Sequence, residues 1–367
     1  MPFHLIGSWT TRYDDLLSHS NEIDFIICPP IDKKLKQHTN IQYIIIRSQS
    51  WRRIRNHFGQ FKYIGYLKNV KWILEENSNA IIKILDNIRL LKDLHTYLTK
   101  KRLRHKCRII FSIHGYSYFF NHEKGLEFYK MADHVIFLTR QSYEFEINRY
   151  SYITPKITIL PNGVNSAKFF KISTQEKGKK KELLGYKNKT VCLWLSQERP
   201  KKGLHILLEA WNKSSLKEAE NFVLLVIGTS RILRQGNIHF LGRIPNDELP
   251  QWYQISDYYF FTTLVHEGHS ISLTEALKCG CTIFASNIDP IHELLCNGTL
   301  GHLIDKPHSP ESWRNILDKI NDGSQLKFDF DKEVLDACYD LVEWRIKMNN
   351  LIREEKELII DNVLFSR

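Results

Sequence analysis

Short apolar runs alternate along the chain with longer segments in which apolar residues recur every three or four positions. Short runs rich in Ile, Val and Phe are typical of buried parallel strands, and the three-or-four spacing is typical of helices that cover a sheet. In the first half, the pattern predicts strands at residues 3–7, 22–28, 41–46, 79–85, 107–113, 134–139 and 156–160. It predicts helices at residues 87–100 and 141–150.

The second half repeats this rhythm. Strands are predicted at residues 190–195, 222–227, 238–241, 258–262, 281–285 and 301–304, and helices at 203–212, 245–255, 270–278 and 309–320. Strand and helix in repetition indicate an open parallel sheet with helices on both faces. We therefore expect an α/β fold of two doubly wound, Rossmann-like domains that face each other across a cleft, with ligands at the carboxyl ends of the strands.

A turn signal, Pro161-Asn162-Gly163, separates the two halves, because Pro, Asn and Gly each favour turns. The predicted domains are residues 1–165 and 166–325, followed by a helical tail, 326–367, that packs back on the first domain. The Lys-rich stretch 173–189 is predicted to be a linker or an exposed loop.

Composition narrows the class of protein. The chain has 367 residues, 43% of them hydrophobic and 25% charged, which excludes bulk disorder and collagen. No apolar run reaches the length of a spanning helix, and the first residues lack the basic start of a signal peptide. We expect a cytoplasmic protein, either free or peripheral on the inner face of the membrane. The seven cysteines form no paired Cys-x-x-Cys motifs, so a zinc cage is not expected.

Charge is divided unequally between the halves. Residues 1–165 hold 25 basic and 14 acidic side chains, whereas residues 166–367 hold 27 of each. The basic residues are densest near Arg52 and between Lys100 and Arg108. Such a field attracts polyanions: an anionic membrane surface, a phosphorylated substrate or nucleic acid. The basic amphipathic segment 49–68 fits a membrane interface or, equally, a core-facing helix with a solvated rim.

The most informative segment runs from Tyr258 to Ala285. Glu267 and Gly268 lie in a predicted strand-to-helix turn, and Glu275 lies eight positions further on, inside the helix. The amides of Ser270, Ile271 and Ser272 would open that helix and point at an anion. Together with Glu275, which could accept hydrogen bonds from hydroxyls, they suit a ligand with both a phosphate and vicinal hydroxyls, such as a nucleotide sugar. The alternative is that Glu275 is a solvated residue on the helix face.

A cationic segment follows the first predicted strand of the second half. Arg199 and Lys202 lie in a loop before Gly203 and a predicted helix. Positive charge at the carboxyl end of a strand suits a diphosphate. The alternative is an ordinary solvated turn.

These segments resemble the retaining glycosyltransferases of the "group 1" family, of bacterial cell-surface polysaccharide type, which have the GT-B fold. Five pieces agree in order over about residues 107–320. They are Ile113-His114-Gly115, Leu160-Pro-Asn-Gly-Val-Asn165, Arg199 to Gly203 before a helix, Gly242-Arg243-Ile244-Pro245, and the two glutamates. The resemblance implies a transferase that moves a hexose from a nucleotide sugar with retention at the anomeric carbon.

The resemblance also implies residue roles. His114, Glu267 and Lys202 would act on the reacting groups. Donor binding would fall to Arg199, Lys202, Gly242, Arg243, Ile244, Gly268, His269, Ser270, Ile271, Ser272 and Glu275, with Glu275 on the ribose and Gly242–Ile244 on the base. Gly7, Ser8 and Asn162 would line the cleft. No cofactor and no metal are expected, because His266 and His269 have the wrong spacing for joint ligation.

Two positions depart from the family pattern. Ser196-Gln197 stand where the family often has Gly-Arg, so Arg199 is expected to supply that charge. Gly7 stands alone where the family often has two glycines. The expected acceptor is a lipid-linked or lipopolysaccharide- or capsule-type glycan at an anionic membrane surface. A nucleotide-sugar epimerase or a phosphorylase on the same fold is an alternative. A non-enzymatic polyanion binder is another, although no nucleic-acid recognition module is present and no nucleic-acid partner is expected.

Overall fold

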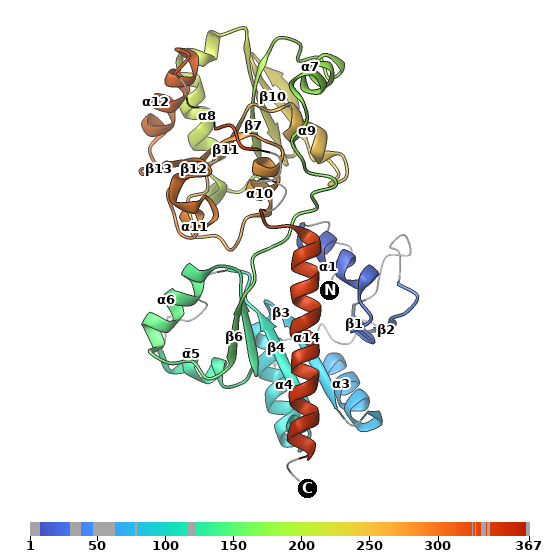
Figure 1. Ribbon diagram of the computed structural model, residues 1–367. Coiled ribbons are helices and arrows are strands. Elements are labelled where there is room, and N and C mark those ends of the chain that lie inside the picture. Colours follow the sequence, from blue (N-terminus) through green and yellow to red (C-terminus); the bar gives the residue numbers. More distant parts are fainter. Residues whose placement is uncertain are drawn as a thin grey trace, which may run out of the picture. The chain divides into compact units, whose positions relative to one another are not determined.

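The computed structural model describes residues 8–29, 38–46, 63–77, 79–115, 122–324, 326, 328–331, 335 and 338–364. The chain forms two compact units, one of Met1–Pro161 with Glu343–Arg367 and the other of Asn162–Val342 (Figure 1). The division falls inside the Pro161-Asn162-Gly163 turn, shortly before the predicted boundary at residue 165. The chain crosses between the units a second time, so the last helix belongs to the first unit.

The second unit is built on a seven-stranded sheet in the order β13-β12-β11-β7-β8-β10-β9. Its strands are β7 (Thr190–Leu195), β8 (Phe222–Ile227), β9 (Ile232–Gln235), β10 (Ile238–Gly242), β11 (Tyr258–Phe261), β12 (Thr282–Ser286) and β13 (His302–Ile304). All neighbours pair in parallel except β9, an exposed edge strand that runs antiparallel to β10. The sequence did not predict β9, because all four of its residues are exposed and they show no alternation of apolar and polar side chains.

Helices cover both faces of this sheet (Figure 1). They are α7 (Thr174–Leu183), α8 (Leu204–Lys213), α9 (Leu249–Ile255), α10 (Ile271–Lys278), α11 (Ile291–Leu294) and α12 (Pro310–Asn321). One apolar core joins the sheet to α8 and α12, and the other joins it to α9, α10 and α11. The strands are buried on both sides, which explains why they appear in the sequence as continuous apolar runs rather than as alternating ones.

The first unit contains a four-stranded parallel sheet in the order β3-β4-β5-β6 and a separate parallel pair, β1-β2. The strands are β1 (Phe25–Cys28), β2 (Gln42–Ile45), β3 (Ala80–Leu85), β4 (Cys107–Ser112), β5 (His134–Phe137) and β6 (Lys156–Ile159). The helices are α1 (Ser8–His19), α3 (Ile64–Glu76), α4 (Ile88–Lys100), α5 (His122–Tyr129), α6 (Arg140–Tyr150) and α14 (Leu341–Leu364). The strand predicted at residues 3–7 lies outside the described residues.

The two faces of the four-stranded sheet differ. Ile109 and Phe111 of β4 point into an apolar core that α3, α4, α5 and α6 complete. Because strand residues alternate between faces, Arg108 and Ser112 lie on the opposite face, which α14 crosses (Figure 1).

A buried ionic cluster fastens α14 to that face. Glu355 accepts from His134 Nδ1 at 2.8 Å and pairs with Arg108, while His134 Nε2 bonds to Thr158 Oγ1 at 2.8 Å. Burial alone would raise the pKa of Glu355, but the hydrogen bonds from His134 and Arg108 outweigh it and lower the pKa. The tail is thus tied to β4, β5 and β6 by a carboxylate that is inaccessible to water.

One expectation about local structure was wrong. The Lys-rich stretch 173–189 is not a linker: Thr174–Leu183 forms α7. Ser173 and Glu176 form a capping box, in which Ser173 Oγ accepts from the amide of Glu176 and Glu176 bonds back to the amide of Ser173. Lys177 and Lys181 also hold Asp257 at 2.9 and 2.6 Å, which explains why so many lysines fall on one short helix.

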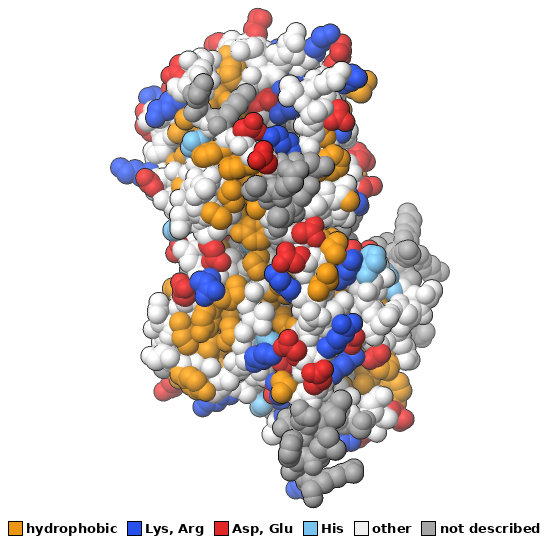
Figure 2. Space-filling model, viewed as in Figure 1, with side chains coloured by type: hydrophobic (Ala, Val, Ile, Leu, Met, Phe, Trp, Pro, Cys, Tyr) orange, Lys and Arg blue, Asp and Glu red, His pale blue; other side chains and the backbone are white. Residues whose placement is uncertain are grey.

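The basic residues of the first unit are only partly free to meet a polyanion. Lys100, Lys101 and Arg102 are exposed. Arg104, by contrast, pairs with Asp133 at 2.6 Å, and Arg108 pairs with Glu355. Figure 2 shows acidic side chains interspersed with basic ones over the face in view. The cluster around Arg52 lies outside the described residues. In the described part of the chain, every helix is too short or too polar to cross a membrane.

The cluster at Glu355 gives a matched test. We expect Glu355→Ala to lower the free energy of unfolding by about 3–5 kcal/mol, because it leaves Arg108 without its buried carboxylate. Glu354→Ala, which removes an exposed partner of Lys156, should cost less than about 1 kcal/mol. Urea denaturation of both variants measures the difference. Equal losses would show that Glu355 does not anchor α14.

Candidate functional site

The strand order of the second unit has one topological switch point, between β7 and β11. From β7 the chain proceeds through β8 and β10 to one side, and from β11 through β12 and β13 to the other. Loops that leave neighbouring parallel strands in opposite directions open a crevice at the carboxyl edge, where ligands of such sheets bind. The predicted Arg199–Gly203 and Glu267–Glu275 segments are the two loops at this point.

The two loops are fastened to each other. Gly203 has φ +70°, and a Cβ there would lie 1.9 Å from the carbonyl oxygen of Thr262, so only glycine fits. Thr262 Oγ1 donates to the carbonyl of Lys202 at 2.9 Å and accepts from Trp194 Nε1 at 3.0 Å. The amide of Leu264 bonds to the carbonyl of Lys201 at 2.8 Å. These bonds fix the backbone from which Lys202 projects.

Lys202 and Glu267 meet at the switch point. Lys202 Nζ forms an ion pair with Glu267 Oε1, and Thr263 Oγ1 donates to the same oxygen at 2.7 Å. Their side chains are 19% and 17% exposed, so both charges can still be reached from solvent. The structure brings together two of the three residues that the sequence analysis placed on the reacting groups.

Helix α10 begins beside this pair. Ser270 is its N-cap and accepts from the amide of Leu273 at 3.4 Å, so the first-turn amides of Ile271 and Ser272 lie at the helix start as expected. Asn162 Nδ2 donates to the carbonyl of His269 at 2.8 Å, and the ring of His269 packs edge-on against Tyr339 at 4.5 Å. These contacts favour a structural role for Asn162 and for the His269 ring, which together hold the turn that starts α10.

Glu275 is buried behind the turn, at 9% exposure. Tyr253 donates to Glu275 Oε2 at 3.0 Å. Burial raises the pKa of Glu275 to about 8, although the bond from Tyr253 opposes the rise. The alternative that Glu275 is a solvated residue is therefore wrong. A buried carboxyl with one hydroxyl partner is suited to bind neutral hydroxyls.

Gly242 ends β10, and Arg243 and Ile244 follow it. Gly242 has φ +74°, and its carbonyl accepts from the amide of Gly228 at 2.7 Å, which joins the ends of β8 and β10. Arg243 is exposed, and Ile244 packs on the core formed with α9 and α10. Arg199 is also exposed, and its amide bonds to the carbonyl of Gln197 at 2.8 Å. The side chains of Arg199 and Arg243 are thus on the surface, unlike those of Lys202 and Glu267.

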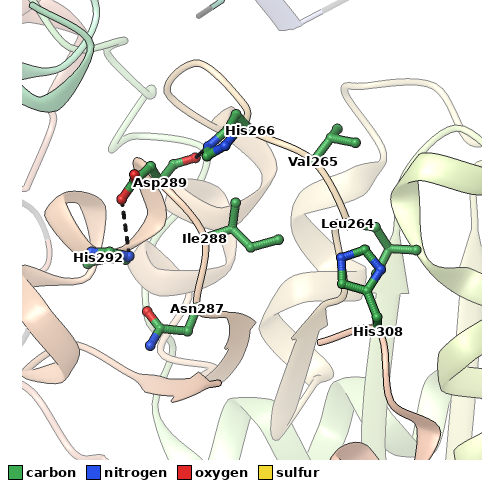
Figure 3. A pocket seen from close by; sticks show the side chains of 8 residues that line it. All are labelled: Leu264, Val265, His266, Asn287, Ile288, Asp289, His292 and His308. Carbon is green, nitrogen blue, oxygen red and sulfur yellow. Dashed lines mark hydrogen bonds and ion pairs between the residues drawn. The ribbon is translucent and has the colours of Figure 1, made fainter. Parts of the chain in front are cut away.

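A pocket of about 390 Å³ lies on the β12 side of the loop that follows β11 (Figure 3). Its residues follow the carboxyl ends of β11, β12 and β13 or begin α11: Leu264, Val265, His266, Asn287, Ile288, Asp289, His292 and His308. His266 Nδ1 lies 3.1 Å from the carbonyl oxygen of Asp289, and His292 Nε2 lies 3.3 Å from Asp289 Oδ1. Imidazole and amide groups of this kind can bind hydroxyls.

The remaining predicted site residues belong to the first unit or fall outside the description. His114 follows β4, and its amide donates to Asp86 Oδ1 at 3.0 Å. Burial, then the charges of Arg12 and Lys83, lowers the pKa of His114 to about 3, so its ring is neutral at physiological pH. Gly7 and the side chain of Ser8 lie outside the described residues. Over the described ranges, no three His, Cys, Asp or Glu side chains are placed to share a metal ion.

Comparison with known proteins agrees with this geometry. Residues 175–334 match the family described as "Glycosyl transferases group 1". An uncharacterized glycosyltransferase of Methanocaldococcus jannaschii is 24% identical over 240 residues, 62% of this chain and 59% of the relative. A phosphatidyl-myo-inositol mannosyltransferase of Propionibacterium freudenreichii is 23% identical over 53% of this chain and 49% of the relative. The chain thus matches only about half of the length of these relatives.

Among solved structures, HepE of Anabaena, in complex with UDP and glucose, is similar to this chain with a TM-score of 0.72. The similarity covers 95% of this chain and 96% of HepE at 18% identity. The fold is therefore the α/β fold of GT-B glycosyltransferases. Taken together, the comparisons support a group 1 glycosyltransferase.

The sequence analysis missed several residues that shape the candidate site. Thr262, Thr263 and Trp194 fix the loops around Lys202, and Tyr253 orients Glu275. The Thr262-Thr263 pair directly after a buried strand was a usable signal, because hydroxyls at a carboxyl edge face the ligand side. Tyr253 gave no signal, since its contact with Glu275 spans 22 positions.

The burial of Glu275 predicts a pH effect. Its folded-state pKa of about 8 lies above the ordinary value of 4.5. Between pH 5 and 8 the folded chain therefore keeps a proton that the unfolded chain has lost, and stability falls as pH rises. As pH rises through this range, we expect the free energy of unfolding of the wild type to fall by up to about 1.4 kcal/mol per pH unit relative to that of Glu275→Gln.

Urea denaturation at pH 5, 6.5 and 8 measures this effect. Glu209→Gln, at an exposed position of α8, is the control and should track the wild type at every pH. Parallel curves for the wild type and Glu275→Gln would mean that Glu275 is not buried as a carboxylic acid.

Proposed function

We propose that this protein transfers a sugar from a nucleotide sugar to a hydroxyl of a glycan or lipid-linked acceptor, with retention at the anomeric carbon and without a metal. The observation that carries the proposal is the meeting of Lys202 and Glu267 at the switch point. The start of α10 lies beside them, and Glu275 lies behind. The cation Lys202 and the amides at the start of α10 match the diphosphate of such a donor, and the buried carboxyl of Glu275 matches its ribose.

The ion pair supports a simple exchange on donor binding. Lys202 is held by Glu267, and Glu267 also accepts from Thr263. A diphosphate would draw Lys202 toward itself, because two phosphates carry more charge than one carboxylate. Glu267 would then be free to accept hydroxyl protons of the transferred sugar. Glu275 would accept from the ribose hydroxyls while Tyr253 keeps its own bond.

Retention is proposed to follow a front-face route. The bond between the anomeric carbon and the diphosphate oxygen breaks, the acceptor oxygen bonds to that carbon from the same face, and the acceptor proton passes to a phosphate oxygen. Negative charge grows on the leaving diphosphate, so Lys202, Arg199 and the first-turn amides of α10 would supply the main stabilisation. His114 is proposed to act as a neutral imidazole that donates a hydrogen bond to a bound substrate rather than as a charged acid.

The acceptor and the location are also proposals. A relative named phosphatidyl-myo-inositol mannosyltransferase and another named O-antigen chain mannosyltransferase B support a lipid-linked or surface-glycan acceptor. The excess of basic residues in 1–165 supports work at an anionic membrane surface on the cytoplasmic side. The exposed Lys100, Lys101 and Arg102 are the described part of that charge.

A panel of nucleotide sugars scored by thermal unfolding tests the proposal. The correct donor should stabilise the folded chain by about 2.7 kcal/mol at one hundred times its Kd, because it binds only the folded state. A stabilising nucleotide sugar should then give transfer only when an acceptor alcohol is present. Nucleotide release without an acceptor would point to an epimerase, and dependence on free phosphate to a phosphorylase. Either result would reject the proposal.

Lys202 gives the mechanistic test. We expect Lys202→Ala to lower kcat by a factor of about 10² or more, because a lost donor at a developing charge costs about 2.7–4 kcal/mol. Lys213→Ala removes an equal charge at an exposed position of α8 and should leave kcat unchanged. A fall of less than tenfold in Lys202→Ala would contradict stabilisation of the leaving group by Lys202.

A further inference from the structure

The first unit contains two neighbouring cations, the buried Arg12 and the half-buried Lys83. Arg12 of α1 is 3% exposed. Lys83 of β3 donates to Ser112 Oγ at 2.9 Å. Ser112 ends β4, and His114 follows two residues later. In the pairing of β3 with β4, Lys83 lies opposite Ile110, and directly opposed residues point to the same face. Ser112 is two residues beyond Ile110 and so lies on that face as well.

Aromatic rings of α1 and α14 lie against the two cations. The guanidinium of Arg12 lies 5.5 Å from the ring centre of Tyr13 and 5.0 Å from that of Trp344 in α14. The Lys83 ammonium lies 6.0 Å from the ring centre of Tyr13. The two rings meet edge-to-face at 5.5 Å. Cation–π contacts of this kind offset only part of the cost of burying a charge.

The cations have no acidic partner among the residues that the structure describes. Nε and Nη1 of Arg12 are buried without a hydrogen-bond partner, and neither Arg12 nor Lys83 forms an ion pair with another described residue. Asp86, at the end of β3, accepts the amide of His114 instead. Burial, and then repulsion from Arg12, lowers the pKa of Lys83 to about 7. Two cations therefore repel each other, with no carboxylate paired to either of them in the described part of the unit.

An oxyanion would remove this imbalance. Arg12 offers two unsatisfied N–H groups, Lys83 an ammonium, Ser112 a hydroxyl and His114 a neutral ring. A phosphate group has enough acceptor oxygens to meet these donors at once, whereas a carboxylate has two. Ser112 and His114 stand at the carboxyl ends of parallel strands, the edge at which such sheets bind ligands.

We propose that Arg12, Lys83, Ser112 and His114 form a phosphate-binding site in the first unit, and that it holds a phosphate group of the acceptor substrate. The assignment to the acceptor rests on the proposed function, in which Lys202 and the start of α10 already serve the diphosphate of the donor. The acceptor is then a phosphorylated sugar or a phospholipid, rather than a neutral glycan.

Thermal unfolding of the full chain in phosphate-free buffer, with and without inorganic phosphate, tests the site. Phosphate should raise the Tm of the wild type in a saturable manner. Lys83→Met removes a half-buried charge that has no acidic partner among the described residues, so without phosphate the Tm of the variant should equal or exceed that of the wild type. With phosphate the order should reverse, because the apparent Kd of the variant should rise at least about tenfold.

Two further variants complete the design. Arg12→Met should weaken phosphate binding in the same way, which keeps the test valid where one variant folds poorly. Lys130→Met, which removes an exposed cation of the same unit, should behave as the wild type. Equal phosphate shifts in the wild type, Lys83→Met and Arg12→Met, or no shift in any of them, would overturn the proposal.

Separate arms identify the source of the phosphate. A hexose phosphate that protects in a Lys83-dependent manner indicates a soluble acceptor, and Lys83-dependent sedimentation with phosphatidylglycerol vesicles, but not phosphatidylcholine vesicles, indicates a lipid. A UDP-induced shift that is lost in Lys83→Met would assign the site to the donor and overturn the acceptor assignment. Absence of any nucleotide shift in the wild type would reject the proposed function alone, since the phosphate arm does not depend on it.

Discussion

The close approach of Gly203 to the carbonyl of Thr262 is the constraint on which the candidate site of the second unit depends. It holds the loops after β7 and β11 in contact at the one place where the sheet reverses its order. A side chain at residue 203 would push the loops apart and separate Lys202 from Glu267. The chemistry of the site is thus set by a backbone contact, and the side chains that meet there follow from it.

The first unit depends on a different kind of contact. Its last helix, α14, arrives from the far end of the chain and is anchored by a buried carboxylate, Glu355, with His134 and Arg108. The same helix carries Trp344, whose ring lies against the guanidinium of Arg12. One long-range element thus both covers a face of the four-stranded sheet and contributes to the surroundings of Arg12.

Much of this could be predicted from the sequence, for identifiable reasons. The bounds of β7 and β8 were predicted to the residue, because strands buried on both faces leave continuous apolar runs. Helix α7 was missed because its capping box, Ser173 and Glu176, was hidden in a Lys-rich stretch that is typical of loops. Glu267 and Lys202 were found because each stands in a short local pattern. Arg12 and Lys83 were not, because their significance arises only where α1, β3 and β4 meet.

The pair formed by Lys202 and Glu267 and the pair of cations formed by Arg12 and Lys83 differ in charge balance. This difference bears on how each would bind the ligand proposed for it. In the second unit Lys202 and Glu267 neutralise each other, so a diphosphate bound as proposed would have to replace a partner that is already present, and the gain would be the difference between two interactions. In the first unit Arg12 and Lys83 have no such partner among the described residues, so an oxyanion would relieve repulsion as well as form new bonds. A site of the first kind releases its ligand readily once the ion pair re-forms, which suits a leaving nucleotide. A site of the second kind favours occupancy, which suits an acceptor that must stay in place while the bond to the sugar forms.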